Sequence, residues 1–439
     1  MNDAPRRGAR PPAAIPPGPA ARRAVETAPA EPPLVLPVAA APSAGAVRGK
    51  RGASATGEAQ AGATRRTRVA IACQGGGSQT AFTAGALRAL LEAGVHERFE
   101  IVSLSGASGG AICAALAWVA LRAGDREPWA RIEAFWRDNA ARTPGELAFN
   151  DLVVGSARLT GQGLTPSFAW SPASPWARAL AQGASAAFGL RPEFTDLGAL
   201  LARHFDAAQL AALSCSTDGP ALIAGAVDTL SGRLARFSSF LEPIRIEHLL
   251  ASCAVPPLFP AVRIDGGAYW DGLYSDNPPV TELAQPGFVG AARMPQEIWV
   301  IKINSTGATS VPERPDAVGD RRNELIGNLS LFQQLDALAW MNELWYEGAF
   351  TPEYARRFEI DGPIRIPRCF GDDRRRDYHL PFIEISAPMA AALDLESKLD
   401  RSPAHLEALL ADGRRQALAF LQAREAAVER EAPGAHPGP

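Results

Sequence analysis

The residue best suited to covalent chemistry is Ser108, at the centre of the pentapeptide that Gly106 opens and Gly110 closes. An apolar run at 99–105 precedes the pentapeptide and an Ala-rich segment at 111–116 follows it, which predicts a strand, a sharp turn and a helix. A G-x-S-x-G pattern in that setting presents a serine hydroxyl at the beginning of a helix, where the helix dipole favours negative charge. The pattern therefore predicts that Ser108 is a nucleophile.

A glycine run, made of Gly75, Gly76 and Gly77, follows the apolar run 67–73. Peptide N–H groups in such a run can approach a substrate closely because no Cβ intervenes, and a nucleophilic serine needs donors of this kind to hold an oxyanion. Loops after neighbouring parallel strands meet at one edge of the sheet, so we expect this run beside Ser108. The run does not match a P-loop, because Ser78-Gln79-Thr80 follows it, and the dinucleotide-binding fingerprint is incomplete.

The nucleophile also requires a proton acceptor. His379 is the one histidine outside the Leu-rich helical stretches and the C-terminal tail, and it is therefore the histidine candidate. The stronger candidate is Asp271, which opens a polar loop that ends with Asn277-Pro278-Pro279. A second Asp-Gly pair begins at Asp265, but it follows a short apolar run and is typical of a hairpin turn.

Four motifs in this chain order resemble those of the patatin-like phospholipase family. They are the glycine run, the Ser108 pentapeptide, the segment 251–260 and Asp271-Gly272. The resemblance covers roughly residues 68–305, and the stretch 322–344 is similar to the tail of bacterial members. It implies a three-layer α/β/α fold with a mixed, largely parallel central sheet. It also implies hydrolysis of lipid acyl esters by a Ser108–Asp271 dyad without a cofactor or metal, with Gly75, Gly76 and Gly77 as the oxyanion hole.

The sequence departs from the family pattern at two positions. The family often has Arg or Lys two residues after the third glycine, where this chain has Gln79. We therefore expect no fixed positive charge at the loop, which favours neutral acylglycerols or other esters over a strict phospholipid specificity. The family's Asp-Gly-Gly or Asp-Gly-Ala reads Asp271-Gly272-Leu273 here, although the downstream Asn-Pro-Pro is kept.

Two other functions remain compatible with these residues. The first is an α/β-hydrolase with a Ser–His–Asp triad, in which His379 is the base. The second is a catalytically weak or inactive protein that binds lipid or protein, for which Gln79 is the indication.

The elements that must position these residues begin at residue 68. Residues 1–67 are rich in Ala and Pro and are expected to be disordered, as is the tail 427–439. The hydrolase domain is expected at 68–305, with either a lid or a structural excursion of small helices at 140–195. A helical extension at 306–426 is expected to pack on it. The patterns predict strands at 67–73, 100–104, 221–227, 234–238 and 298–303, and helices at 80–93, 322–348 and 390–424, the last with a fresh start at Ser402-Pro403.

Charge and composition limit the partners. The net charge is −3, but residues 1–68 carry eleven Lys or Arg and four Asp or Glu, so the remainder is acidic and nucleic acid is not an expected partner. Five cysteines without a C-x-x-C motif indicate neither a disulfide framework nor a zinc site. No run approaches the roughly 20 apolar residues of a membrane helix. We expect a cytoplasmic or membrane-peripheral protein that contacts membrane surfaces transiently; an export signal at Arg22-Arg23 is the alternative.

Overall fold

The computed structural model describes residues 66–166, 171, 174–358, 360, 362–368 and 379–431, with side chains up to residue 426. The expected disordered segment 1–67 lies outside the described residues except for its last two. Of the expected tail 427–439, residues 427–431 are described, as the end of a helix.

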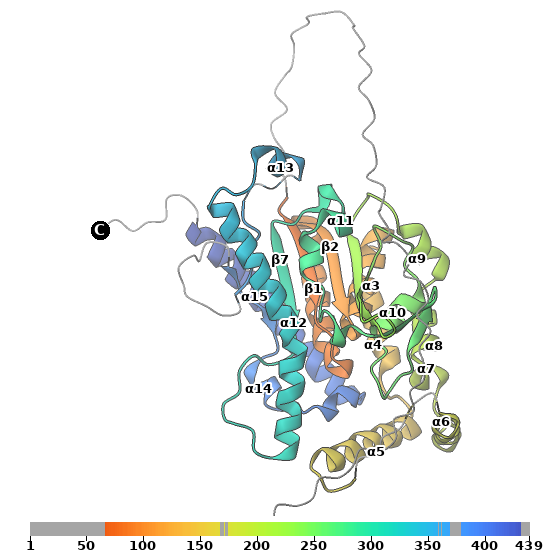
Figure 1. Cartoon of the computed structure of the whole chain (residues 1–439). Coiled ribbons are helices and arrows are strands. Elements are labelled where there is room, and N and C mark those ends of the chain that lie inside the picture. Colours follow the sequence, from red (N-terminus) through yellow and green to blue (C-terminus); the bar gives the residue numbers. More distant parts are fainter. Residues whose placement is uncertain are drawn as a thin grey trace, which may run out of the picture. The chain divides into compact units, whose positions relative to one another are not determined.

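A mixed sheet of eight strands forms the centre of the fold, in the order β10-β7-β1-β2-β3-β6-β5 with β4 paired to β3 (Figure 1). Neighbouring strands from β10 to β3 are parallel, whereas β4, β5 and β6 pair in antiparallel fashion. The predicted α/β class, with a largely parallel sheet between helical layers, is confirmed. The strands are β1 (Arg68–Cys73), β2 (Glu100–Ala107), β3 (Ala221–Asp228), β4 (Leu234–Ser238), β5 (Val262–Ile264), β6 (Gly267–Asp271), β7 (Glu297–Lys302) and β10 (Ile383–Glu384).

Strand β1 shows why helices cover both faces of this sheet. Its side chains alternate between two hydrophobic clusters, with Val69 and Ile71 on one face and Ala70 and Ala72 on the other, and all four are buried. A strand that is buried on both faces reads as a continuous apolar run, which is what the sequence shows. The first cluster includes α1 (Ala81–Glu92), α3 (Gly109–Ala123) and α15 (Pro403–Glu431), and α12 (Pro315–Tyr346) packs in the second (Figure 1).

The C-terminal helices differ from the predicted ones at their ends. Helix α12 begins at Pro315, seven residues before the expected start at 322, because proline suits the first turn of a helix. The helix expected between 390 and the fresh start at Ser402-Pro403 is wrong. Only α14 (Ala387–Ala390) and the 3₁₀ turn η5 (Glu396–Leu399) precede α15, which begins at Pro403 as Ser402-Pro403 indicates. No helix of the described chain has both the length and the apolarity that a membrane crossing requires.

The segment between α3 and β3 is helical. Its elements are α4 (Ala130–Asn139), α5 (Pro144–Gly161), α6 (Pro175–Phe188), α7 (Pro192–Thr195), α8 (Leu197–His204) and α9 (Ala207–Leu213). Figure 1 shows α5 and α6 next to each other. The remaining helices are α2 (Val95–Arg98), α10 (Ile246–Ser252), α11 (Pro286–Val289) and α13 (Pro352–Arg357).

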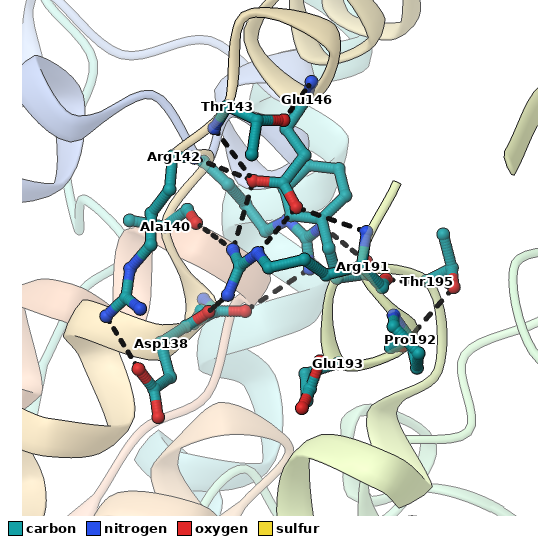
Figure 2. A network of polar contacts seen from close by, with 12 residues as sticks. Asp138, Ala140, Arg142, Thr143, Glu146, Arg191, Pro192, Glu193 and Thr195 are labelled. Carbon is teal, nitrogen blue, oxygen red and sulfur yellow. Dashed lines mark hydrogen bonds and ion pairs between the residues drawn. The ribbon is translucent and has the colours of Figure 1, made fainter. Parts of the chain in front are cut away.

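Glu146 joins the start of α5 to the chain before α7 (Figure 2). Its buried carboxylate accepts hydrogen bonds from Arg191 Nε at 2.6 Å and from the N–H groups of Arg142 and Thr143 at 2.7 and 3.1 Å. The Thr143 hydroxyl accepts the Glu146 N–H in return, which completes a capping box. Burial raises the pKa of Glu146, but the Arg191 and backbone donors outweigh it and lower the pKa to about 2.

Glu146→Gln should lower the free energy of unfolding at pH 7 by about 3 kcal/mol, because it leaves Arg191 without its counter-charge. The folded-state pKa is depressed, so the wild-type advantage is complete above the unfolded pKa of 4.5 and declines as the pH falls toward 2. Urea denaturation of both proteins at pH 7 and pH 3.5 measures this difference. A difference of equal size at the two pH values would contradict the ion-pair explanation.

Candidate active site

Ser108 occupies the turn between β2 and α3 in a strained conformation. Its φ is 53°, a left-handed value that residues with a Cβ rarely adopt. Glycine is required on both sides, since a Cβ on Gly106 would overlap the backbone of Gly110, and a Cβ on Gly110 would overlap the backbone of Cys73. The Ser108 N–H donates to the carbonyl and the hydroxyl of Ser252, both at 3.0 Å. The turn thus holds the serine at the uncapped N-terminus of α3.

The glycine run lies directly beside Ser108. Strands β1 and β2 are parallel with Cys73 opposite Gly106, so the loops that follow them meet, and a Cβ on Gly75 would lie 2.7 Å from Ser108 Cβ. The Gly75 N–H donates to Asn277 Oδ1 at 2.8 Å, and the Gly76 N–H donates to Thr80 Oγ1 at 3.0 Å.

Two other N–H groups of these loops are available. Gly77 has a φ of 58° and begins the 3₁₀ turn η1 (Gly77–Thr80). Within the described chain, neither its N–H nor that of Gly109 makes a hydrogen bond. The free donors next to Ser108 are therefore those of Gly77 and Gly109, whereas the N–H groups of Gly75 and Gly76 hold the loop in shape.

Asp271 reaches the turn that holds Ser108 because β3 extends beyond the end of β2. The last partner of β2 on β3 is Gly225, and the next residue, Ala226, pairs with Asp271. Gly272 must be small here, since its Cβ would lie 2.7 Å from Ala107 Cβ. The Asp271 side chain is fully buried, Oδ1 accepts the Leu273 N–H at 2.7 Å, and Oδ2 has no hydrogen-bond partner among the described residues.

The surroundings of Asp271 set its pKa near neutrality. Burial is the largest effect and raises the pKa of Asp271 to about 7. The Leu273 N–H, the Ser108 side chain and the charge of Lys398 oppose burial and lower it. A carboxyl with this pKa can accept a proton and return it near pH 7.

Asn277 and Gln74 connect the loops of this site. Asn277 is buried and binds the Gly75 peptide through two hydrogen bonds. Its Oδ1 accepts the Gly75 N–H, and its Nδ2 donates to the Gly75 carbonyl at 3.3 Å. Gln74 Oε1 accepts the N–H groups of Ile303 and Asn304 at 2.8 and 3.0 Å, and its Nε2 donates to the Gly327 carbonyl at 2.9 Å. Sequence reasoning assigned neither residue a role, although Asn277 lies in the Asn-Pro-Pro pattern that identified Asp271.

The structure keeps the other two candidate bases away from Ser108. Arg365 forms a parallel bridge with Glu297, the first residue of β7. Strand β8 (Ile366–Pro367) comes directly after Arg365, and β9 (His379–Leu380) pairs with β8, so His379 lies near the beginning of β7. Ser108 instead follows the end of β2, a parallel strand, so His379 lies toward the opposite end of the sheet. Asp265 has a φ of 48° and forms the turn between β5 and β6, where it is exposed and paired with Arg245.

The expectation that the glycine loop has no positive charge beside it is wrong. Gln79 Nε2 donates to Ser397 Oγ at 2.9 Å and to the Asp394 carbonyl at 3.0 Å, which holds η5 against the loop. Lys398 on η5 then places Nζ 3.5 Å from the position that a Cβ on Gly76 would occupy. No local pattern could indicate Lys398, because it is far from the glycine run along the chain.

Comparisons with known proteins relate part of this chain to a described family. Residues 71–284 match the sequence model of the family described as patatin-like phospholipase. VipD from Legionella pneumophila is similar in structure, with a TM-score of 0.36 and 15% identity over 81% of this chain and 67% of that chain. A complex of SpcU with ExoU from the type III secretion system of Pseudomonas aeruginosa matches with a TM-score of 0.22 and 17% identity, over 62% of this chain and 51% of that chain, about half its length. No curated protein matches the sequence. Residues 71–284 therefore form a domain of the patatin-like phospholipase family.

Proposed function

We propose that the protein is a serine acyl hydrolase of lipid esters, of the phospholipase A, lipase or esterase type, which acts through a dyad of Ser108 and Asp271. The observation that carries the proposal is the buried Asp271 carboxylate, whose Oδ2 is unpartnered among the described residues and whose pKa responds to the Ser108 side chain. Family membership supports a lipid ester as the substrate.

In the proposed mechanism, Asp271 accepts the hydroxyl proton while Ser108 Oγ attacks the ester carbonyl carbon. The carbonyl oxygen becomes an oxyanion, which the free N–H groups of Gly77 and Gly109 stabilise. Collapse of this intermediate breaks the bond to the alcohol, which takes the proton from Asp271 and leaves an acyl group on Ser108. A water molecule then gives its proton to Asp271, attacks the acyl group and releases the fatty acid, and Ser108 regains its proton.

The helices of the insertion support access from a lipid surface. On α5 and α6, Leu152, Trp176 and Leu180 are 55%, 57% and 66% exposed. Apolar side chains that face water on a soluble fold are suited to transient contact with the apolar part of a membrane or micelle. We propose that this segment, rather than the catalytic loops, makes that contact.

A fluorophosphonate probe tests the proposal directly. It should label the folded protein at a single serine, which peptide mass spectrometry should identify as Ser108. Loss of hydrolysis should follow the extent of labelling, on a panel of p-nitrophenyl esters, diacylglycerols and phospholipids. Urea-unfolded protein is the control and should not be labelled. A folded protein that takes no label and cleaves no member of the panel would be a binding scaffold, and the proposal would be wrong.

A further inference from the structure

Lys398 is unusual in this chain, which has three lysines and 41 arginines. Arginine keeps its charge at every accessible pH and binds flat anions through two parallel hydrogen bonds. Lysine is a compact charge whose pKa responds to its surroundings. A lysine where arginine is the rule therefore places a charge that can titrate, which arginine would not.

The position of Lys398 ties it to the glycine loop through both its main chain and its side chain. A Cβ on Gly77 would overlap the Lys398 carbonyl, so η5 and the loop are in backbone contact. Nζ lies 3.5 Å from the position of a Cβ on Gly76 and donates to Asn304 Oδ1 at 3.2 Å. The ammonium is therefore close to the loop but forms no hydrogen bond to it.

Several contacts fix the segment that carries Lys398. Besides the two hydrogen bonds from Gln79, the Ser397 N–H donates to Asp394 Oδ1 at 2.7 Å. Arg158 on α5 forms an ion pair with Asp394 at 2.8 Å. The segment is thus held both by the turn that follows the glycine run and by the insertion.

The charges around Lys398 come from several elements and are mostly acidic. Burial is the largest effect and lowers the pKa of Lys398 to about 8, although Glu324, Asp271 and Asp320 each raise it. The ammonium is therefore present below about pH 8 and is lost above it. The charges that act on Lys398 are those of Asp271 at the end of β6 and of Asp320 and Glu324 on α12. On its own segment, Asp394 and Glu396 precede it by four and two residues, and Arg158 on α5 pairs with Asp394.

We propose that Lys398 is a positioning residue of the acyl-hydrolase site, whose ammonium keeps Asp271 in its carboxylate form and places positive charge beside the loop where the oxyanion forms. The inference rests on the proposed function and extends it to a residue outside the matched segment 71–284. A buried carboxylate with one unpartnered oxygen needs a nearby cation to remain charged. Because acidic groups surround Lys398, its charge serves the site itself and does not attract a separate anion.

This assignment gives the reaction two opposing pH requirements. Asp271 must be deprotonated, which occurs above about pH 7, and Lys398 must be protonated, which occurs below about pH 8. We therefore expect a bell-shaped dependence of kcat/KM on pH, whose two limbs belong to the coupled pair.

Two substitutions separate the charge of Lys398 from its packing. Lys398→Met keeps most of the side-chain length and removes the charge; it should lower kcat on a p-nitrophenyl ester at pH 7.5 by about 30-fold and change KM less than threefold. It should also move the acidic limb to higher pH. Lys398→Arg keeps the charge and should restore activity to within about fivefold of wild type, but without the alkaline limb, since arginine stays protonated above pH 10. Matched thermal midpoints verify that the variants fold.

A readout that needs no turnover keeps the test independent of the proposed function. In protein labelled with ¹³C at aspartate carboxyls, Asp271→Asn identifies the Asp271 resonance, and its titration gives the pKa. We expect Lys398→Met to raise that pKa by at least half a unit, whether or not the wild type hydrolyses esters. An unchanged Asp271 titration would overturn the inference. So would an alkaline limb that survives in Lys398→Arg, or an equal loss of activity in both variants at every pH. If Lys398→Met shifts the Asp271 titration but the wild type shows no Ser108-dependent hydrolysis, only the proposed function is refuted.

Discussion

Ser108→Ala should abolish ester hydrolysis, with kcat/KM reduced by about 10⁴-fold or more, because no other hydroxyl takes the place of the attacking oxygen. The change removes one atom from a side chain whose neighbours are held by the backbone, so the fold should not change. Steady-state hydrolysis of p-nitrophenyl butyrate, with active-site titration of the wild type, measures the loss.

Ser108→Gly is the matched variant that separates chemistry from backbone strain. Alanine at a φ of 53° is as strained as serine, whereas glycine adopts such values without penalty. Both variants should be inactive, but Ser108→Gly should be more stable than Ser108→Ala by about 1 kcal/mol in urea denaturation. Appreciable activity in either variant would exclude Ser108 as the nucleophile.

Asp271→Asn should reduce kcat/KM by about 10³-fold or more, since the amide cannot accept the serine proton. The wild-type acidic limb should fall about tenfold per pH unit below pH 7, because the base is protonated there. Asp265→Asn is the control, as it makes the same change in the other Asp-Gly pair, on an exposed turn. Retained activity in Asp271→Asn, or its loss in Asp265→Asn, would contradict the assignment.

Asp271→Asn should also stabilise the fold in alkaline solution. The folded pKa of Asp271 is raised from 3.8 to about 7, so the folded protein binds this proton more tightly than the unfolded chain. Stability is therefore lost as the pH rises from about 4 to 7, by up to about 4 kcal/mol, and an uncharged asparagine avoids that loss. Urea denaturation should show Asp271→Asn more stable than wild type at pH 8 and the advantage much smaller at pH 5. An inactive variant with increased stability is the signature of a functional buried charge.

Much of the candidate site could be predicted because its features are local. The turn at Ser108 requires only a strand, small neighbours and a helix within a short stretch, and the adjacent glycine run follows from the parallel pairing of β1 and β2. The hairpin turn at Asp265 is equally local, and the structure confirms it.

The rest depends on contacts that no short pattern encodes. Whether the N–H group of Gly75 is free depends on Asn277, which is 202 residues away along the chain. Lys398 reaches the loop through hydrogen bonds made by Gln79, the residue whose identity suggested that a positive charge was missing. The start of α15 at Pro403 was predicted from Ser402-Pro403, but residues 391–402 were wrongly expected to be helical. They contain good helix formers, and tertiary contacts such as that of Ser397 with Gln79 outweigh this local preference.

The arrangement of α1, β1 and their covers has a consequence for synthesis on the ribosome. Strand β7 pairs with the edge of β1 opposite β2, and α15 meets α1 at Gly85 and Gly413, where a Cβ on either glycine would overlap the other helix's backbone. Ser108, the glycine loop and Asp271 all emerge before β7 and long before α15. A nascent chain that ends near residue 284 thus contains Ser108 and Asp271, but leaves one edge of β1 unpaired and α1 without its contact to α15. We therefore expect the loops around Ser108 to reach their final arrangement only after β7 and α15 have been synthesised.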